Sequence, residues 1–229
     1  MILKLYKSES PSEAFSLAWT IKSCISDVKV WVVQNKLQLN DNKTEVLLIG
    51  SAPGIDLPSS VCVGHSDIPF SNEARNLGVI FDSQLALKEQ MNKLCQLAYL
   101  EIRRIGSIRQ YLCFETSNTL LSSHVLSRLD YCNALLAGSP RVLLDKSQRV
   151  INYSARLVFK TPKSVHNTPL LCDLHWLPIS SWIQYKIAVI CFHIVSGTAP
   201  SYRSLGGFIS VLSFSLCSVS LRYSHLPCS

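Results

Sequence analysis

Acidic residues are scarce in this sequence of 229 residues, which holds 15 Asp plus Glu against 22 Lys plus Arg. No two acidic residues lie closer than four positions, and the pairs at that spacing are Glu9/Glu13 and Asp41/Glu45. Metal-dependent nucleotidyl transfer needs two or more carboxylates within a few ångströms of each other. The sequence therefore has no local signature of a metal site.

Nucleophile and phosphate-binding motifs are also absent. The sequence contains no G-x-S-x-G, no G-x-x-x-x-G-K-[ST] and no G-x-G-x-x-G. These absences remove support for a serine hydrolase, a P-loop enzyme or a dinucleotide-binding enzyme. We therefore expect no catalytic residue, no metal ligand and no cofactor.

Signals for secretion or membrane insertion are weak. Lys4 and Lys7 interrupt the first apolar residues, unlike a secretory signal. The longest uncharged run, residues 204–221, contains six serines and two glycines and is a poor bilayer span. Nine cysteines, an odd number without framework spacing, indicate reduced thiols. We expect a cytoplasmic or nuclear location and no membrane partner.

The formal net charge of +7 is concentrated in one segment. Residues 1–87 carry 7 basic and 9 acidic side chains, residues 88–163 carry 12 and 5, and residues 164–229 carry 3 and 1. Such segregation is typical of a surface that binds a polyanion, although ordinary solubility is the alternative explanation.

The apolar periodicity predicts an α+β fold. One helix is expected over residues 14–32, followed by strands at 45–49, 61–63, 68–70 and 76–81. From Ser83 onward the period changes to 3.6, which predicts mainly helical structure. The expected helices cover residues 87–105, 116–136, 142–159 and 183–194.

The basic segment alternates cations with aromatic rings, which include Tyr99, Tyr111, Phe114, Tyr153 and Phe159. Cations neutralise phosphates and rings can stack on bases, although core packing is the alternative for the rings. Arg149, Arg156, Lys160 and Lys163 lie close together along one expected helix and its exit. The predicted nucleic-acid-binding cations are Arg103, Arg104, Arg109, Arg149, Arg156 and Lys160.

Several strings resemble reverse transcriptases of non-LTR (LINE-type) retrotransposons. DVKVW at 27–31, NKLQLN at 35–40 and KTEVLLIG at 43–50 are similar to the stretch that follows the catalytic aspartates in that family. NLGVIFD at 76–82 resembles its primer-grip turn. SRLDYCNALL at 127–136, LHWLP at 174–178 and APSY at 199–202 match the segment beyond. The resemblance runs in order from about Leu3 to Tyr202.

The resemblance implies a layout of four parts. Residues 1–82 would be a palm remnant (a helix plus a small antiparallel β element) with a primer-grip-like turn, and 83–163 a basic, helical, thumb-like region. Residues 164–203 would be a C-terminal helical region and 204–229 a Ser-rich tail. It also implies nucleic-acid contacts at Leu77 and Gly78, and a pyrophosphate-side role for Lys43.

The family's Tyr/Phe-Ala-Asp-Asp turn, which holds its Mg²⁺, has no counterpart here, since the chain opens with MILKLY. We therefore expect no catalysis from this chain, and at most non-specific binding of an RNA/DNA hybrid or duplex. Two alternatives stay open. One is a helical module that binds a protein through exposed apolar surface, and the other is an active polymerase with an incomplete gene model.

Overall fold

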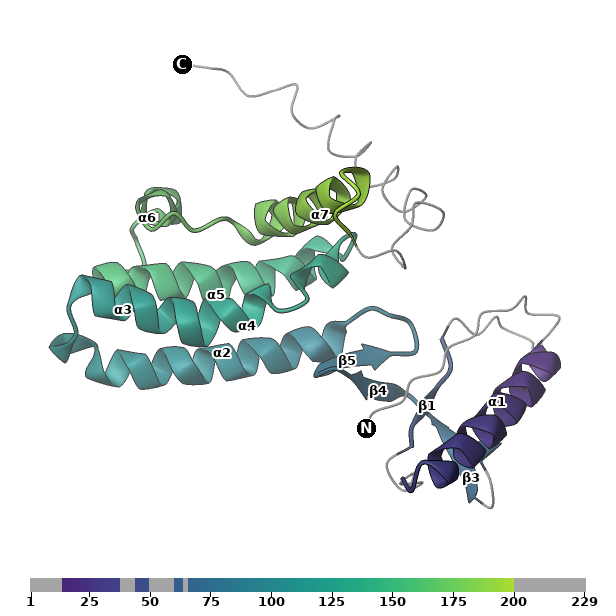
Figure 1. Ribbon diagram of the computed structural model, residues 1–229. Coiled ribbons are helices and arrows are strands. Elements are labelled where there is room, and N and C mark those ends of the chain that lie inside the picture. Colours follow the sequence, from purple (N-terminus) through teal and green to yellow (C-terminus); the bar gives the residue numbers. More distant parts are fainter. Residues whose placement is uncertain (1–13, 38–43, 50–59, 64–65, 200–229) are drawn as a thin grey trace. The chain divides into compact units, whose positions relative to one another are not determined.

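The computed structural model describes residues 14–37, 44–49, 60–63 and 66–199 (Figure 1). The chain divides into two compact units, Met1–Gln90 and Met91–Ser229. The first unit combines a helix with small β-sheets and the second is helical in its described part, which confirms the predicted α+β class. The domain boundaries expected at 82/83, 163/164 and 203/204 remain predictions.

A three-stranded sheet and helix α1 (Ala14–Gln34) form the core of the first unit. The central strand β3 (Ser66–Ser71) runs parallel to β1 (Val46–Leu47) and antiparallel to β2 (Ser60–Val63). Val61 and Ile68 are buried, and three partly buried side chains pack against them: Ile25, Val46 and Phe70. Apolar contact between one face of α1 and the sheet therefore holds this unit together.

The hairpin of strands β4 (Glu73–Asn76) and β5 (Val79–Asp82) corrects the strand predicted over residues 76–81. Asn76 pairs with Val79, so Leu77 and Gly78 form a two-residue turn. Their φ angles are 48° and 87°. Positive φ at both turn positions gives a type I′ geometry, which suits the twist of a hairpin. The apolar run at 76–81 predicted a single strand because apolar periodicity alone does not show that the chain reverses direction at Leu77 and Gly78.

Asp82 organises the loop between the hairpin and α2 (Lys88–Ile108). Its carboxylate accepts hydrogen bonds from the backbone N–H groups of Leu87 at 2.8 Å and Ala86 at 3.1 Å. Desolvation by burial raises the pKa of Asp82, but the bonds from Leu87, Ala86 and other backbone groups together lower it below its usual value. The side chain thus acts as a charged clamp just before the helix.

The second unit is a helical assembly built around α5 (Arg141–Phe159). Helix α5 contacts α3 (Phe114–Leu121), α6 (Asn167–Asp173) and α7 (Ile179–Val195), and α2 runs alongside (Figure 1). Its buried face carries Val150, Ile151, Ala155 and Val158. The predicted helices at 87–105, 142–159 and 183–194 are confirmed, whereas α6 was not predicted.

The helix predicted over 116–136 is interrupted. The observed elements are α3, the π-helical turn η4 (Ser122–Leu126), α4 (Ser127–Asp130) and the 3₁₀ turn η5 (Asn133–Leu136). Cys132 adopts a left-handed conformation with φ 57°, which stops α4. Asp130 accepts one local hydrogen bond from Asn133 and one long-range hydrogen bond from Lys186, and both stabilise the chain where the helix ends. No Gly or Pro marks it in the sequence.

Candidate nucleic-acid interface

A row of cations follows one face of α5. Lys146, Arg149 and Arg156 recur at spacings of three and seven residues, which places them on one side of the helix, and Lys160 follows as its C-cap residue. We call these four residues the α5 stripe. Arg149 and Lys160 are exposed, whereas Lys146 and Arg156 are half-buried. With 1.5 Å per residue, the α5 stripe spans about 21 Å.

Tyr153 lies in the middle of the α5 stripe and is 40% exposed. Its ring makes an edge-on contact with Tyr99 of α2, at 5.9 Å between centroids. Lys163, from the loop after α5, holds its ammonium 5.9 Å from the Tyr153 ring centroid, within the range of a cation–π contact. Cations and a partly exposed ring therefore share one surface.

The pKa of Tyr99 reports the charge around this ring pair. Burial is the main cause that raises this pKa, and Cys95 and Tyr153 raise it further. The positive charge of Arg149 lowers the pKa of Tyr99, so the two side chains are close enough to interact electrostatically. Tyr99 is therefore a neutral phenol at physiological pH.

Helix α2 fixes the start of the α5 stripe. Lys146 Nζ donates to Asn92 Oδ1 at 2.7 Å, and the neighbouring Ser147 hydroxyl contacts Met91 Sδ at 2.7 Å. Met91 and Ser147 are buried, so the two helices are closely packed here. This contact orients the Lys146 ammonium without neutralising it.

The charge of the α5 stripe is largely uncompensated. Within the described part of the chain, Arg149, Lys160 and Lys163 form no ion pair with a carboxylate. The ion pairs in the second unit lie elsewhere, between Lys186 and Asp130 and between Glu101 and two arginines. Uncompensated cations on one surface produce the positive potential that attracts a polyanion.

The predicted pair Arg103 and Arg104 separates in the structure. Arg103 is exposed and follows Tyr99 by four residues, which places it on the side of α2 next to the α5 stripe. Arg104 donates to Glu101 at 3.1 Å, and Arg128 lies 3.7 Å from the same carboxylate. Arg103 is thus retained at the interface, whereas Arg104 belongs to a separate ion-pair cluster.

Arg109 is a correction to the predicted set. It is only 7% exposed, and its guanidinium donates to the carbonyls of Leu157, Leu112 and Val158 at 2.8, 2.7 and 2.5 Å. Leu157 and Val158 are in the last turn of α5, where carbonyls have no partner within the helix. Arg109 therefore caps the C-terminal end of α5, and its buried guanidinium is not available to bind a phosphate.

Arg156 has a divided role. Its Nη2 group donates to the carbonyl of Val165 at 3.5 Å, which connects α5 to the loop before α6. The residue stays half-buried on the α5 stripe. It contributes positive charge to the surface, but Arg149 and Lys160 are the more accessible cations.

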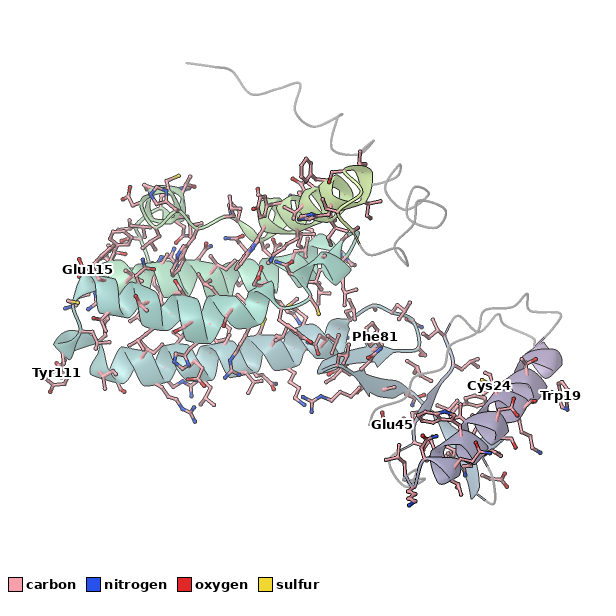
Figure 2. The ribbon with its side chains drawn as sticks, viewed as in Figure 1. Trp19, Cys24, Glu45, Phe81, Tyr111 and Glu115 are labelled. Atoms are coloured by element: carbon pink, nitrogen blue, oxygen red, sulfur yellow. The ribbon has the colours of Figure 1, made fainter. Side chains whose placement is uncertain are left out.

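The aromatic residues of the basic segment divide in the same way. Phe114 and Phe159 pack edge-on at 5.3 Å between centroids, joining α3 to the end of α5. Tyr111 is 80% exposed and projects from the far end of α2 (Figure 2). Only Tyr153, partnered by Tyr99, combines exposure with a place on the α5 stripe.

The family resemblance also named three residues of the first unit as candidates, Leu77, Gly78 and Lys43. Leu77 and Gly78 are exposed at the hairpin turn of the first unit, and Leu77 is 71% exposed. Their contact with nucleic acid stays a prediction. Lys43 lies outside the described residues.

Lys146 was not among the predicted cations, although its spacing from Arg149 and Tyr153 on the expected helix is a signal for it. In the described ranges, no three His, Cys, Asp or Glu side chains converge to form a metal site. In the same ranges, no helix combines the length and apolar character that a bilayer span requires.

No family model, curated protein or solved structure matches the chain.

Proposed function

We propose that the chain binds nucleic acid through the α5 stripe, flanked by Arg103 and Lys163, without reading base sequence. The observation that carries the proposal is the alignment of three cations on one face of α5, with a fourth at its C-cap, around a partly exposed tyrosine. Phosphates spaced along a strand meet such a row directly, and Tyr153 offers an aromatic surface for an unpaired base or a sugar.

The resemblance to LINE-type reverse transcriptases supports an RNA–DNA hybrid or duplex as the ligand, and we propose descent from the palm and thumb of such an enzyme. The proposed activity is binding. Neither the described side chains nor the sequence motifs give a reason to propose a catalytic role for this chain alone.

The test is the affinity of the full chain for a fluorescein-labelled RNA–DNA hybrid, measured by anisotropy between about 50 and 200 mM salt. Four phosphate contacts predict a slope of log K against log salt near −3.6, from about −0.9 per contact. Several hybrids of unrelated sequence should bind equally well. Absence of binding at low salt, or an affinity that does not respond to salt, would refute the proposal.

A pair of matched variants locates the surface. Arg149→Gln combined with Lys160→Gln removes two exposed cations from the α5 stripe and should make the slope shallower by about 2. Arg104→Gln combined with Arg128→Gln removes the same charge from the cluster around Glu101 and should change the slope much less. Equal effects of the two variants would show that net charge alone, rather than the α5 stripe, determines binding.

A further inference from the structure

Helix α7 is apolar on more than the face it buries. Ile183 and Ile194 are buried, and α7 contacts α5 and η5 of the second unit. A second row of apolar side chains is exposed, with Tyr185 at 57%, Phe192 at 68% and Val195 at 79%, together with Ala188. We call these four residues the α7 seam. A helix that is apolar all round is usually buried, so the α7 seam marks an interaction surface.

The spacing of the α7 seam is that of a coiled-coil contact line. Its residues recur at three, four and three positions, which is the alternation of the a and d positions of a heptad repeat. The positions that flank this line in the same repeat are Gln184, Val189, Cys191 and Ser196, and none of them is charged. An identical helix would therefore meet no like charge along the α7 seam.

The side-chain sizes along the α7 seam fit a second copy in the antiparallel orientation. The spacing reads the same in both directions, so a twofold axis at the level of residue 190 places Phe192 opposite the partner's Ala188. The same axis places Tyr185 opposite the partner's Val195, so a large side chain faces a smaller one at each level. A parallel copy would instead bring two Phe192 rings together and leave a gap between two Ala188 methyl groups.

The Phe192 ring is already ordered in the single chain. It makes an edge-on contact with the His193 imidazole, at 6.0 Å between centroids and 71° between planes. His193 Nδ1 in turn lies 2.8 Å from the Thr198 hydroxyl, and the Ser196 hydroxyl donates to the Phe192 carbonyl at 2.6 Å. A ring that is ordered before association loses less conformational entropy when it binds.

The exposed area sets the strength of such a contact. At roughly 200 Å² per buried ring, the exposed fractions of Tyr185 and Phe192 amount to about 250 Å² per copy. With Val195 and Ala188 added, the total over two copies stays below the ~1,200 Å² at which standard interfaces begin. We therefore expect a reversible association that requires high protein concentration.

We propose that two copies of the chain associate through the α7 seam, with the two α7 helices antiparallel. Each Phe192 ring packs over the partner's Ala188, on either side of the twofold axis. This association goes beyond nucleic-acid binding and does not depend on it, because it uses another helix and residues without charge.

Sedimentation equilibrium of the full chain tests the association. The weight-average mass should rise with concentration from the 25.5 kDa of one chain toward twice that value. Phe192→Glu introduces a charge into the α7 seam and should weaken the dimer at least about tenfold. Tyr111→Glu changes a comparably exposed ring in η3 (Arg109–Tyr111) and should leave the dimer unchanged. Urea unfolding confirms that both variants are folded. A constant mass, or equal weakening by the two variants, would overturn the proposal.

Photo-crosslinking with p-benzoylphenylalanine in place of Phe192 tests the orientation. Trypsin cleaves after Lys186 and Arg203, so residues 187–203 form one peptide. A crosslink between two copies of this peptide can arise only between two chains. Fragment masses should place the attachment near residue 188, whereas a parallel pair predicts attachment near residue 192. Attachment near residue 192, or crosslinks confined to another part of the chain such as residues 204–222, would overturn the proposal.

Discussion

Arg109 shows that a cation in a basic segment can serve the fold instead of a ligand. Its three hydrogen bonds to carbonyls join the end of α2 to the end of α5. Replacing it with Gln removes a buried charge and leaves helix-end carbonyls without partners. We expect Arg109→Gln to lower the free energy of unfolding of the second unit by about 3 kcal/mol, measured by urea unfolding.

The matched control is Arg103→Gln, which removes an exposed arginine six positions earlier and should change stability by no more than about 0.5 kcal/mol. The two variants should show opposite behaviour in binding, since Arg103 flanks the α5 stripe and Arg109 does not. If Arg109→Gln kept full stability but weakened binding, the capping role would be wrong.

Asp82 gives a prediction about pH. Its pKa lies below the ordinary 3.8 in the folded state, so the carboxylate stabilises the fold above pH 3.8. That contribution is lost as the pH falls through the lower, folded-state pKa. Asp82→Asn keeps one acceptor oxygen but loses the second backbone hydrogen bond and the charge, so it should cost up to about 1 kcal/mol at neutral pH. It should also weaken the acid sensitivity of the unfolding midpoint.

Urea midpoints measured from neutral pH to below pH 3.8 check this prediction. Asp145→Asn provides a control carboxylate in the other unit, for which no backbone clamp is observed. Identical pH profiles for the wild type and Asp82→Asn would contradict the clamp.

Individual arginines show how far the sequence alone predicts which cations are available for binding. The pairing of Arg104 with Glu101 follows from their spacing of three on a helix and could have been predicted. The burial of Arg109 could not, because two of its partners lie 48 and 49 residues away. Composition locates a basic segment, but tertiary contacts decide which cations face solvent.

At the scale of elements, the β4–β5 turn carries the most specific prediction. Leu77 holds φ 48° without being glycine, a conformation that Asn and Gly adopt more easily. Leu77→Gly should therefore raise the free energy of unfolding of the first unit by up to about 1 kcal/mol. Gly78→Ala, at φ 87°, should lower it by at least a similar amount.

Chemical denaturation of both variants checks the turn geometry, and Ala86→Gly in the following loop provides a comparison for backbone flexibility. Stabilisation by Gly78→Ala would contradict a type I′ turn. A loss of stability in Leu77→Gly would mean that contacts of the Leu77 side chain outweigh its backbone strain.

Long periodic helices were the most predictable elements. Helix α5 follows its expected range closely because a continuous apolar face and the following Pro162 mark it. The break after α4 was not predictable, since Cys132 adopts a left-handed conformation without Gly or Pro nearby. Contacts between Asp130 and Lys186, 56 residues apart, stabilise that region instead.

In the molecule as a whole, the basic segment of the sequence divides into exposed, ion-paired and buried cations. Of the six predicted cations, Arg149, Arg156 and Lys160 meet on α5 and Arg103 lies beside them. Arg104 is ion-paired and Arg109 is buried. Lys146 joins the set through its contact with α2. The uncompensated charge on and next to α5 is therefore arranged as a row, and a row fits a phosphate backbone.

Lysine acetylation of the full chain, with and without an RNA–DNA hybrid, tests the role of the α5 stripe most directly. Mass spectrometry reads each lysine separately, so the experiment maps the bound surface. The hybrid should protect Lys146, Lys160 and Lys163, whereas Lys186 of α7, which is paired with Asp130 of α4, should label equally in both samples. Protection of Lys186 alone, or equal labelling of all four lysines under conditions where the hybrid is bound, would contradict it.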